Sequence, residues 1–284
     1  METVRVAAGM VRALAVMAVA AGPLSAQEQV SPAWKVAEGA AEDSAGRLAE
    51  GYTTFYNARY DETTAIASAL LTASPDDLEA LELRTSALLF RLKALLGDAK
   101  NKEKALKACE SCPDMLSLMS TDTLHAQTVA RRRLTANPDD EHTRFLLGKI
   151  DLNHVWLQLG PLGKRAGWDE YWEARRSLDA VLEKHPGHVR AKVARAWMDY
   201  IVDTRVPWGT KWILGGGNRK KALAAAREAA IAAGEPHTRA EARFALWEME
   251  LKEKNHAEAL AIARDLLRDY PENKDLLKFV AAKP

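Results

Sequence analysis

The sequence predicts an all-α protein built from repeated helical hairpins. Ala and Leu, which favour helices, are abundant, while β-branched residues are sparse. Apolar residues recur at i, i+3, i+4 and i+7, as in the segments ARRSLDAVLEKHPGH and ALAIARDLLRDYPEN. At five places a small residue is followed, twelve positions later, by Pro or Gly. Together these observations indicate amphipathic helices that pack in pairs and end at regular stops.

Each residue of the recurring pair has its own structural role. The small residue lets a neighbouring helix approach closely, and the Pro or Gly ends the second helix of a hairpin. Asp or Asn follows several of these stops, where a side-chain oxygen is needed to cap the next helix. The five pairs are Thr63 and Pro75, Ala126 and Pro138, Ala174 and Pro186, Ala222 and Gly234, and Ala259 and Pro271.

Residues 1–26 have the features of a secretory signal peptide. Arg5 and Arg12 supply positive charge, a short apolar run follows, and Ala26 offers a small residue for cleavage. The alternative is a transmembrane anchor, which needs about 20 apolar residues, more than this run supplies. We therefore expect a periplasmic or secreted protein with no membrane span after cleavage. Residues 27–44, rich in Ala, Glu, Gln and Ser, are expected to form a linker.

Residues 45–284 resemble the tetratricopeptide repeat (TPR). The family pattern has a Leu-Gly pair in the first helix, Ala in the second and a closing Pro. Leu147-Gly148 and the five small residues follow it, whereas Leu246-Trp247 has Trp in place of Gly. The resemblance implies a TPR-like α-solenoid, a right-handed superhelix of about five helix-turn-helix units. The segment GGGNRKKALAAAREA is more weakly similar to the helical T-component of TRAP-type solute transporters.

Three units are longer than the family repeat of about 34 residues. The extra residues fall around 91–121, 159–168 and 205–218, and we expect inserted helices or loops there. Insertions of this kind often lie on the binding side of a repeat array. Residues 273–284 are expected to form a capping helix that shields the last unit.

Cys109 and Cys112 are the two cysteines of the chain, in the segment KACESCPD. In an oxidising compartment this spacing favours a local disulfide. Two alternatives remain, free thiols and a redox or metal function. A thioredoxin-type CxxC requires a βαβ context, for which this sequence offers no strands, and a metal site would need two further ligands.

We find no candidate catalytic, metal or cofactor site in the sequence and expect no enzyme. Lys+Arg number 40 and Asp+Glu 39, so no strong field is available to attract nucleic acid. The His residues are scattered, and neither an HExxH nor a Gly-x-Ser-x-Gly motif occurs. Residues 215–218, GGGN, precede a helix but lack the Gly-Lys-Ser/Thr ending of a nucleotide loop. We interpret them as a hinge rather than a phosphate cradle.

The TPR resemblance implies that the first helix of each unit lines a concave groove. Leu48 and Tyr52 occupy the positions of the leading Lys and Asn in the clamp by which some family members bind acidic tails, so that clamp is absent. The groove is predicted to be aromatic with few charges, and it either binds a partner or is filled by its own side chains. Its expected residues are Tyr52, Phe55, Tyr56, Phe145, Lys149, Trp197, Tyr200, Phe244 and Glu248.

Trp208 and Trp212, near Pro207, are two further candidate binding residues. They either dock on the array as a plug or form an exposed apolar tip that contacts a partner or a membrane surface. The leading hypothesis is a periplasmic protein-interaction scaffold that binds a protein through the groove or the inserted loops. The alternative is an accessory component of a solute transporter that handles a small ligand or its binding subunit.

Overall fold

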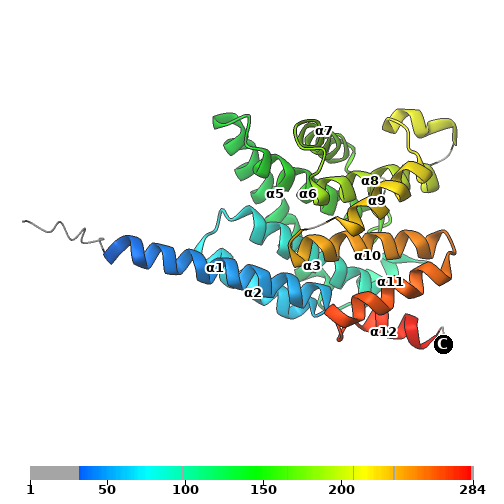
Figure 1. Ribbon diagram of the computed structural model, residues 1–284, viewed down its shortest axis with the longest axis horizontal. Helices are drawn as coiled ribbons and strands as arrows, with labels where there is room; N and C mark the ends of the chain where they lie inside the picture. Colours follow the sequence, from blue (N-terminus) through cyan, green and yellow to red (C-terminus); the bar gives the residue numbers. More distant parts are fainter. Residues whose placement is uncertain (1–31, 98, 165, 207, 233, 283–284) are drawn as a thin grey trace, which may run out of the picture. The chain divides into compact units, whose positions relative to one another are not determined.

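The computed structural model describes residues 32–97, 99–164, 166–206, 208–232 and 234–282. The expected signal peptide, residues 1–26, lies outside this range. Residues 41–284 form one compact unit, and the description below concerns that unit. All regular elements of the described residues are helices, which confirms the predicted all-α fold (Figure 1). No helix within these residues combines the length and the apolar character that crossing a membrane requires.

The helices follow one another as antiparallel pairs. A short helix α4 (Lys102–Ala108) and a 3-10 helix η1 (Trp208–Leu214) are inserted in the second and fourth pairs, and α12 (Lys274–Ala281) ends the array. The pairs are α1 (Pro32–Tyr56) with α2 (Tyr60–Ala73), α3 (Leu78–Leu96) with α5 (Cys112–Ala136), α6 (Glu141–Leu159) with α7 (Trp168–Lys184), α8 (Val189–Arg205) with α9 (Arg219–Ile231), and α10 (Pro236–Lys252) with α11 (His256–Asp269).

The small residues of the repeat pattern lie where the helices of a pair meet. All five are in second helices, α2, α5, α7, α9 and α11, and each is at most 2% exposed. Gly148 of α6, a first helix, likewise allows the two helices of its pair to approach closely. A Cβ added there would come within 3.2 Å of Leu178 and 3.3 Å of Ser177 on α7. Any larger side chain would therefore push α6 and α7 apart.

Short polar residues begin several helices, as the capping pattern predicts. Asp77, Asp140, Asn218 and Asn273 each accept hydrogen bonds from backbone N–H groups in the first turn of α3, α6, α9 and α12. These bonds satisfy donors that have no partner inside the helix.

The structure places helix α1, which begins at Pro32, over residues 32–44 of the expected linker, and residues 27–31 lie outside the described residues. Ala and Glu are strong helix formers, and Pro is well tolerated in the first turn of a helix. The three expected insertions become helix α4, a connection between α6 and α7, and helix η1. Each insertion lies between the first and the second helix of a pair, so all three emerge at the carboxyl ends of first helices.

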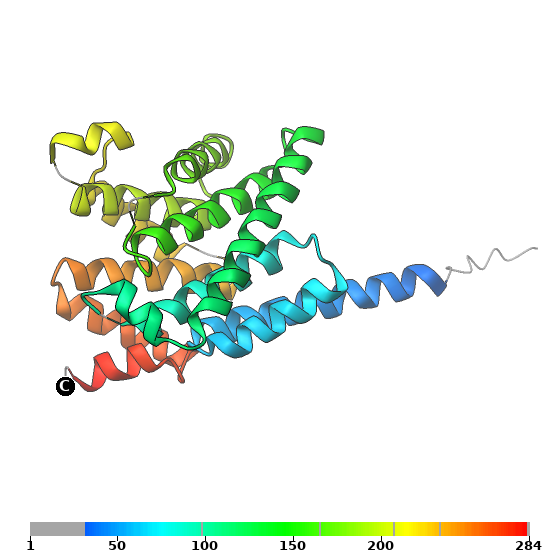
Figure 2. The same cartoon turned by 180° about the vertical axis from the view of Figure 1, so that it is seen from behind.

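The array closes on itself, because α1 packs against the C-terminal helices (Figures 1 and 2). The side-chain amide of Asn273 donates to the carbonyl oxygen of Tyr56 at 2.7 Å, and Asn57 Oδ1 accepts from the backbone N–H of Glu272 at 3.0 Å. The ring of Tyr56 stacks on Phe244 of α10 with centroids 5.3 Å apart. Closure turns the predicted concave groove into a partly enclosed cavity.

Replacement of Asn273 by Ala tests this closure. The side chain is 4% exposed and combines the cap of α12 with the bond to Tyr56. We expect the free energy of unfolding to fall by about 2–3 kcal/mol, from one lost cap and one buried carbonyl left without a donor. Urea denaturation followed by circular dichroism measures this.

Asn218→Ala is the matched control, because Asn218 caps α9 through its bond to the N–H of Lys221. We expect a loss of about 1 kcal/mol there. Equal losses in the two variants would show that the bond between Asn273 and Tyr56 does not stabilise the closed array.

Candidate functional site

A cavity of about 630 Å³ lies inside the array, between the first helices α1, α3, α6, α8 and α10. Seven of the nine residues expected in the groove line it. They are Tyr52, Phe55, Tyr56, Lys149, Trp197, Phe244 and Glu248. Tyr52 and Tyr56 are themselves almost fully buried, whereas Phe55, Trp197 and Phe244 are half-buried. The first helices thus fill part of the concave face and leave part of it open to a ligand.

Two of the expected groove residues, Phe145 and Tyr200, do not line this cavity. Phe145 is 2% exposed and packs under the guanidinium of Arg190, 5.0 Å from its ring centroid. The hydroxyl of Tyr200 donates to Glu253 Oε1 at 2.8 Å in a separate surface cleft. Both side chains lie in contacts between helices. Neighbouring first helices cross at an angle, so different parts of the apolar stripe of each helix are covered by its neighbours.

The two inserted tryptophans are only partly described. The side chain of Trp208 lies outside the described residues. Trp212 is 76% exposed on η1, which excludes a plug for this residue.

Four charged side chains form the base of the cavity, and this cluster differs from the predicted groove with few charges. Arg190 Nε donates to Glu241 Oε2 at 2.6 Å, and its Nη2 donates to Glu82 Oε2 at 3.1 Å. Lys149 Nζ pairs with Glu241 and lies 3.7 Å from Glu82 Oε1. Tyr52 donates to Glu82 Oε2 at 3.4 Å. The cluster therefore joins α1, α3, α6, α8 and α10.

The cluster is electrically balanced, with two carboxylates and two cations. Burial alone would raise the pKa of Glu241, but the charges and hydrogen bonds of Lys149 and Arg190 outweigh it and lower the pKa to about 2. Because the folded pKa lies below the unfolded value, this pairing stabilises the fold above about pH 4.5. The stabilisation is lost as the pH falls toward 2.

The sequence did carry a signal for this cluster. Arg190, Val193, Ala194 and Trp197 follow the i, i+3, i+4, i+7 spacing of one helix face, with a charge in an otherwise apolar stripe. Glu82 lies in the same way among the leucines of α3. Charged residues in corresponding stripes of several first helices predict a buried ion network, and their pairing required the tertiary structure.

The mouth of the cavity lies at the carboxyl ends of the same helices. Phe90 and Lys93 line it from α3, Trp156 from α6, Arg205 from α8 and Lys252 from α10. The inserted segments also emerge at this end, since each follows a first helix. The cavity thus runs from a neutral base, past aromatic walls, to a mouth rich in cations.

Among the carboxyl groups of the described residues, Asp151 has the pKa that is raised furthest above its ordinary value. It is fully buried, accepts a hydrogen bond from Gln127 at 2.8 Å, and burial raises its pKa to about 8. It lies in the packed core and does not line the cavity. Among the described residues, no three His, Cys, Asp or Glu side chains gather in a way that would hold a metal ion.

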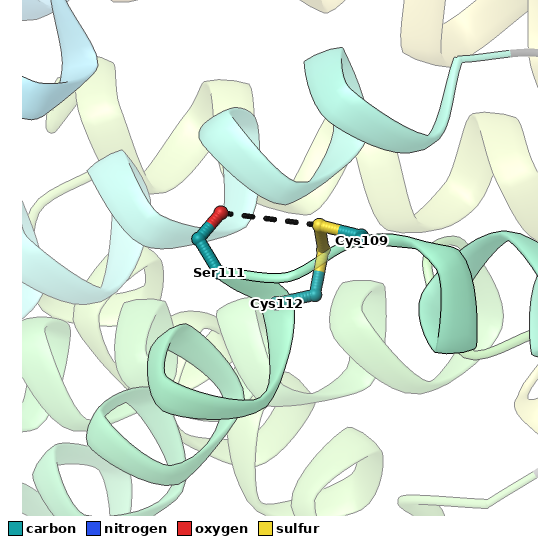
Figure 3. Close-up of a disulfide and its surroundings, with 3 residues drawn as sticks. All are labelled: Cys109, Ser111 and Cys112. Atoms are coloured by element: carbon teal, nitrogen blue, oxygen red, sulfur yellow. Dashed lines mark hydrogen bonds between the residues drawn. A yellow bond between two sulfur atoms is a disulfide. The ribbon is translucent and has the colours of Figure 1, made fainter.

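Cys109 and Cys112 form a disulfide with Cα atoms 5.4 Å apart, at the turn between α4 and α5 (Figure 3). Cys112 is fully buried and Ser111 Oγ lies 3.9 Å from Cys109 Sγ. The bond ties the inserted α4 to the start of α5.

Arg190→Ala tests whether the charged cluster holds the first helices together. The change leaves Glu82 and Glu241 buried with Lys149 as the remaining cation, so we expect the free energy of unfolding to fall by about 3–5 kcal/mol. Chemical denaturation followed by circular dichroism is the measurement. Lys107→Ala removes an exposed pair with Glu103 and serves as the control, for which we expect no measurable change. Similar stabilities of the two variants would refute a structural role for the cluster.

Comparison with solved structures finds a thermophilic TPR protein of Thermus thermophilus. The two chains share 18% identity at a TM-score of 0.46, over 84% of this chain and 98% of that one. No protein-family model matches the chain, and no curated protein matches it. At this identity and TM-score we infer nothing about function from the likeness. The TPR-like architecture is instead supported by the order of the helix pairs and by the buried small residues between them.

Proposed function

We propose that this protein is an exported interaction scaffold that binds a protein partner through the tip formed by η1. The resemblance of its repeats to the TPR family implies protein partners, and the observation that carries the proposal is an exposed apolar tip on a well-anchored segment. The closed array argues against the groove as the partner site.

Side chains from α7 and α8 hold the segment around η1. Tyr171 donates to the carbonyl of Leu214 at 2.9 Å, and Arg175 donates to the carbonyls of Leu214 and Gly215, both at 3.2 Å. Lys211 pairs with Asp203 at 2.6 Å. These bonds fix the backbone of the segment before any partner arrives, which lowers the entropy cost of binding.

Two apolar side chains of the tip face solvent. Trp212 is 76% and Ile213 52% exposed. The indole N–H of Trp212 donates to the carbonyl of Gly209 at 3.1 Å, which orients the ring. Tryptophans presented in this way are frequent anchors of protein interfaces.

Export is the second part of the proposal. The charge, apolar run and cleavage site of residues 1–26 support it. The disulfide between Cys109 and Cys112 agrees with an oxidising compartment such as the periplasm.

The partly enclosed cavity favours a second candidate function, an accessory component of a solute transporter that handles a small ligand. Its volume of about 630 Å³ falls within the range of small-molecule sites. The tip and the cavity are separate features, so the two functions are testable separately.

Trp212→Ala tests the scaffold proposal. We expect the recovery of the partner from envelope extract by the immobilised protein to fall at least about tenfold, as for an interface anchor. Quantitative mass spectrometry of the captured proteins gives the ratio to the unmodified chain.

The matched control is Ile231→Ala, which removes an 87% exposed apolar side chain at the end of α9. This variant is expected to capture the partner normally. Capture that is equally strong in all three proteins, or no specific protein captured by the unmodified chain, would reject the tip as the partner site.

Export is checked by sequencing the N-terminus of the protein recovered from the periplasmic fraction of its native host. We expect the mature chain to begin at Gln27. An intact N-terminus in a cytoplasmic fraction would refute export and leave the test of Trp212 unaffected.

A further inference from the structure

We propose that the cavity binds an anionic amphiphile, with its apolar body between the aromatic walls and its anionic head group among Lys93, Arg205 and Lys252 at the mouth. The inference deepens the second candidate function by naming a ligand class. It does not depend on the partner site at Trp212.

The depth of the cavity suits an elongated ligand. Glu82 at the base and Lys93 at the mouth lie on the same helix, α3, eleven residues apart. The helical rise makes that separation about 16 Å. A ligand along this axis passes through environments of different polarity, so it has to be amphipathic.

The walls between base and mouth are apolar. Trp156, Trp197 and Phe244 line the cavity and are half-buried, and Leu89 and Ala245 lie between them. Flat aromatic faces of this kind offer a large contact area to an alkyl chain or a ring. Transfer of an apolar body from water to this surface supplies about 25 cal/mol per Å² of buried area.

The charges decide which end of the ligand faces outward. At the base, Glu82 and Glu241 neutralise Lys149 and Arg190, so no unmatched charge remains for a ligand head group. At the mouth the balance is different. Among the described residues, no carboxylate lies within 4.0 Å of the ammonium group of Lys93 or Lys252.

The cations of the mouth sit at the edge of the apolar wall. Lys93 Nζ lies 4.3 Å from the ring centroid of Phe90, and Lys252 Nζ lies 6.0 Å from that of Trp197. Arg205 and Lys252 also line the adjoining surface cleft, which adds Lys220 from the start of α9. An anionic head group at the mouth therefore meets complementary charge on two sides.

The charges at the mouth point to an anionic head group. Lys93, Arg205 and Lys252 contribute three positive charges at the mouth, and Glu248 contributes one negative charge. Together these four side chains carry a net charge of +2, which attracts an anionic head group and repels a cationic one. We therefore assign an anionic head group to the ligand.

Dodecanoate is the probe, and dodecyltrimethylammonium is the control with the same tail and the opposite charge. Both are titrated into the purified mature chain below their micelle concentrations, with isothermal calorimetry and tryptophan fluorescence as readouts. Trp156 and Trp197 line the cavity, so a ligand there changes the fluorescence. We expect dodecanoate to bind at least about tenfold more tightly than the cationic probe, equivalent to about 1.4 kcal/mol.

The double variant Lys93→Glu with Lys252→Glu tests the mouth. We expect it to bind dodecanoate at least about tenfold more weakly and the cationic probe more tightly, a reversal that misfolding would not produce. Lys104→Glu changes an exposed lysine outside the cavity and is expected to bind both probes like the parent chain. Ala245→Phe fills the cavity wall and is expected to abolish binding of both probes.

Each contrary result is decisive. Equal affinity for the two probes, no binding of either probe, or binding that survives Ala245→Phe would overturn the proposal. Trp212→Ala is expected to leave dodecanoate binding unchanged, so failure of this inference and failure of the partner site are distinguishable.

Discussion

Arg190 lies in the middle of the array, where its guanidinium bridges Glu82 of α3 and Glu241 of α10. Charges that leave water are stable only when they find partners with good geometry, and a buried carboxylate without a cation would be very costly. The positions of α3, α6, α8 and α10 are therefore tied together through one cluster. Because these residues come from four different repeat units, the cluster constrains the curvature of the whole array and not just one hairpin.

That constraint brings the two ends of the compact unit together. With α10 held against α3, the aromatic rings of α1 reach Phe244, and Asn273 reaches the backbone of Tyr56. An open repeat array offers its concave face to a partner along its whole length. In this protein α1 packs against the C-terminal helices, and a partly enclosed cavity remains between aromatic walls. Closure thus separates the surface available to a small ligand from the surface available to a protein.

The insertions follow from the same geometry. Each one joins a first helix to its second helix, so all three lie at the end of the array where the cavity opens. The core repeats keep their small residues and close packing, while the added chain carries the features that distinguish this protein. The disulfide fastens the first insertion, and hydrogen bonds from Tyr171 and Arg175 fasten the third. Anchored insertions beside a cavity mouth place the proposed partner site and the proposed ligand site at one end of the molecule.

The sequence by itself determined the helices, their pairing and the places where they stop. These are local properties, set by a period of about 3.6 residues, by small residues such as Ala174 and by stops such as Pro186. Seven of the nine residues that it predicted for the groove line the cavity, because first-helix positions follow from the repeat. The tertiary structure alone decided the closure between Tyr56 and Asn273, the pairing of Glu82 with Arg190, and the outward position of Trp212. Those contacts join residues far apart in the chain, and their geometry depends on small crossing angles summed over several repeats, which no local pattern encodes.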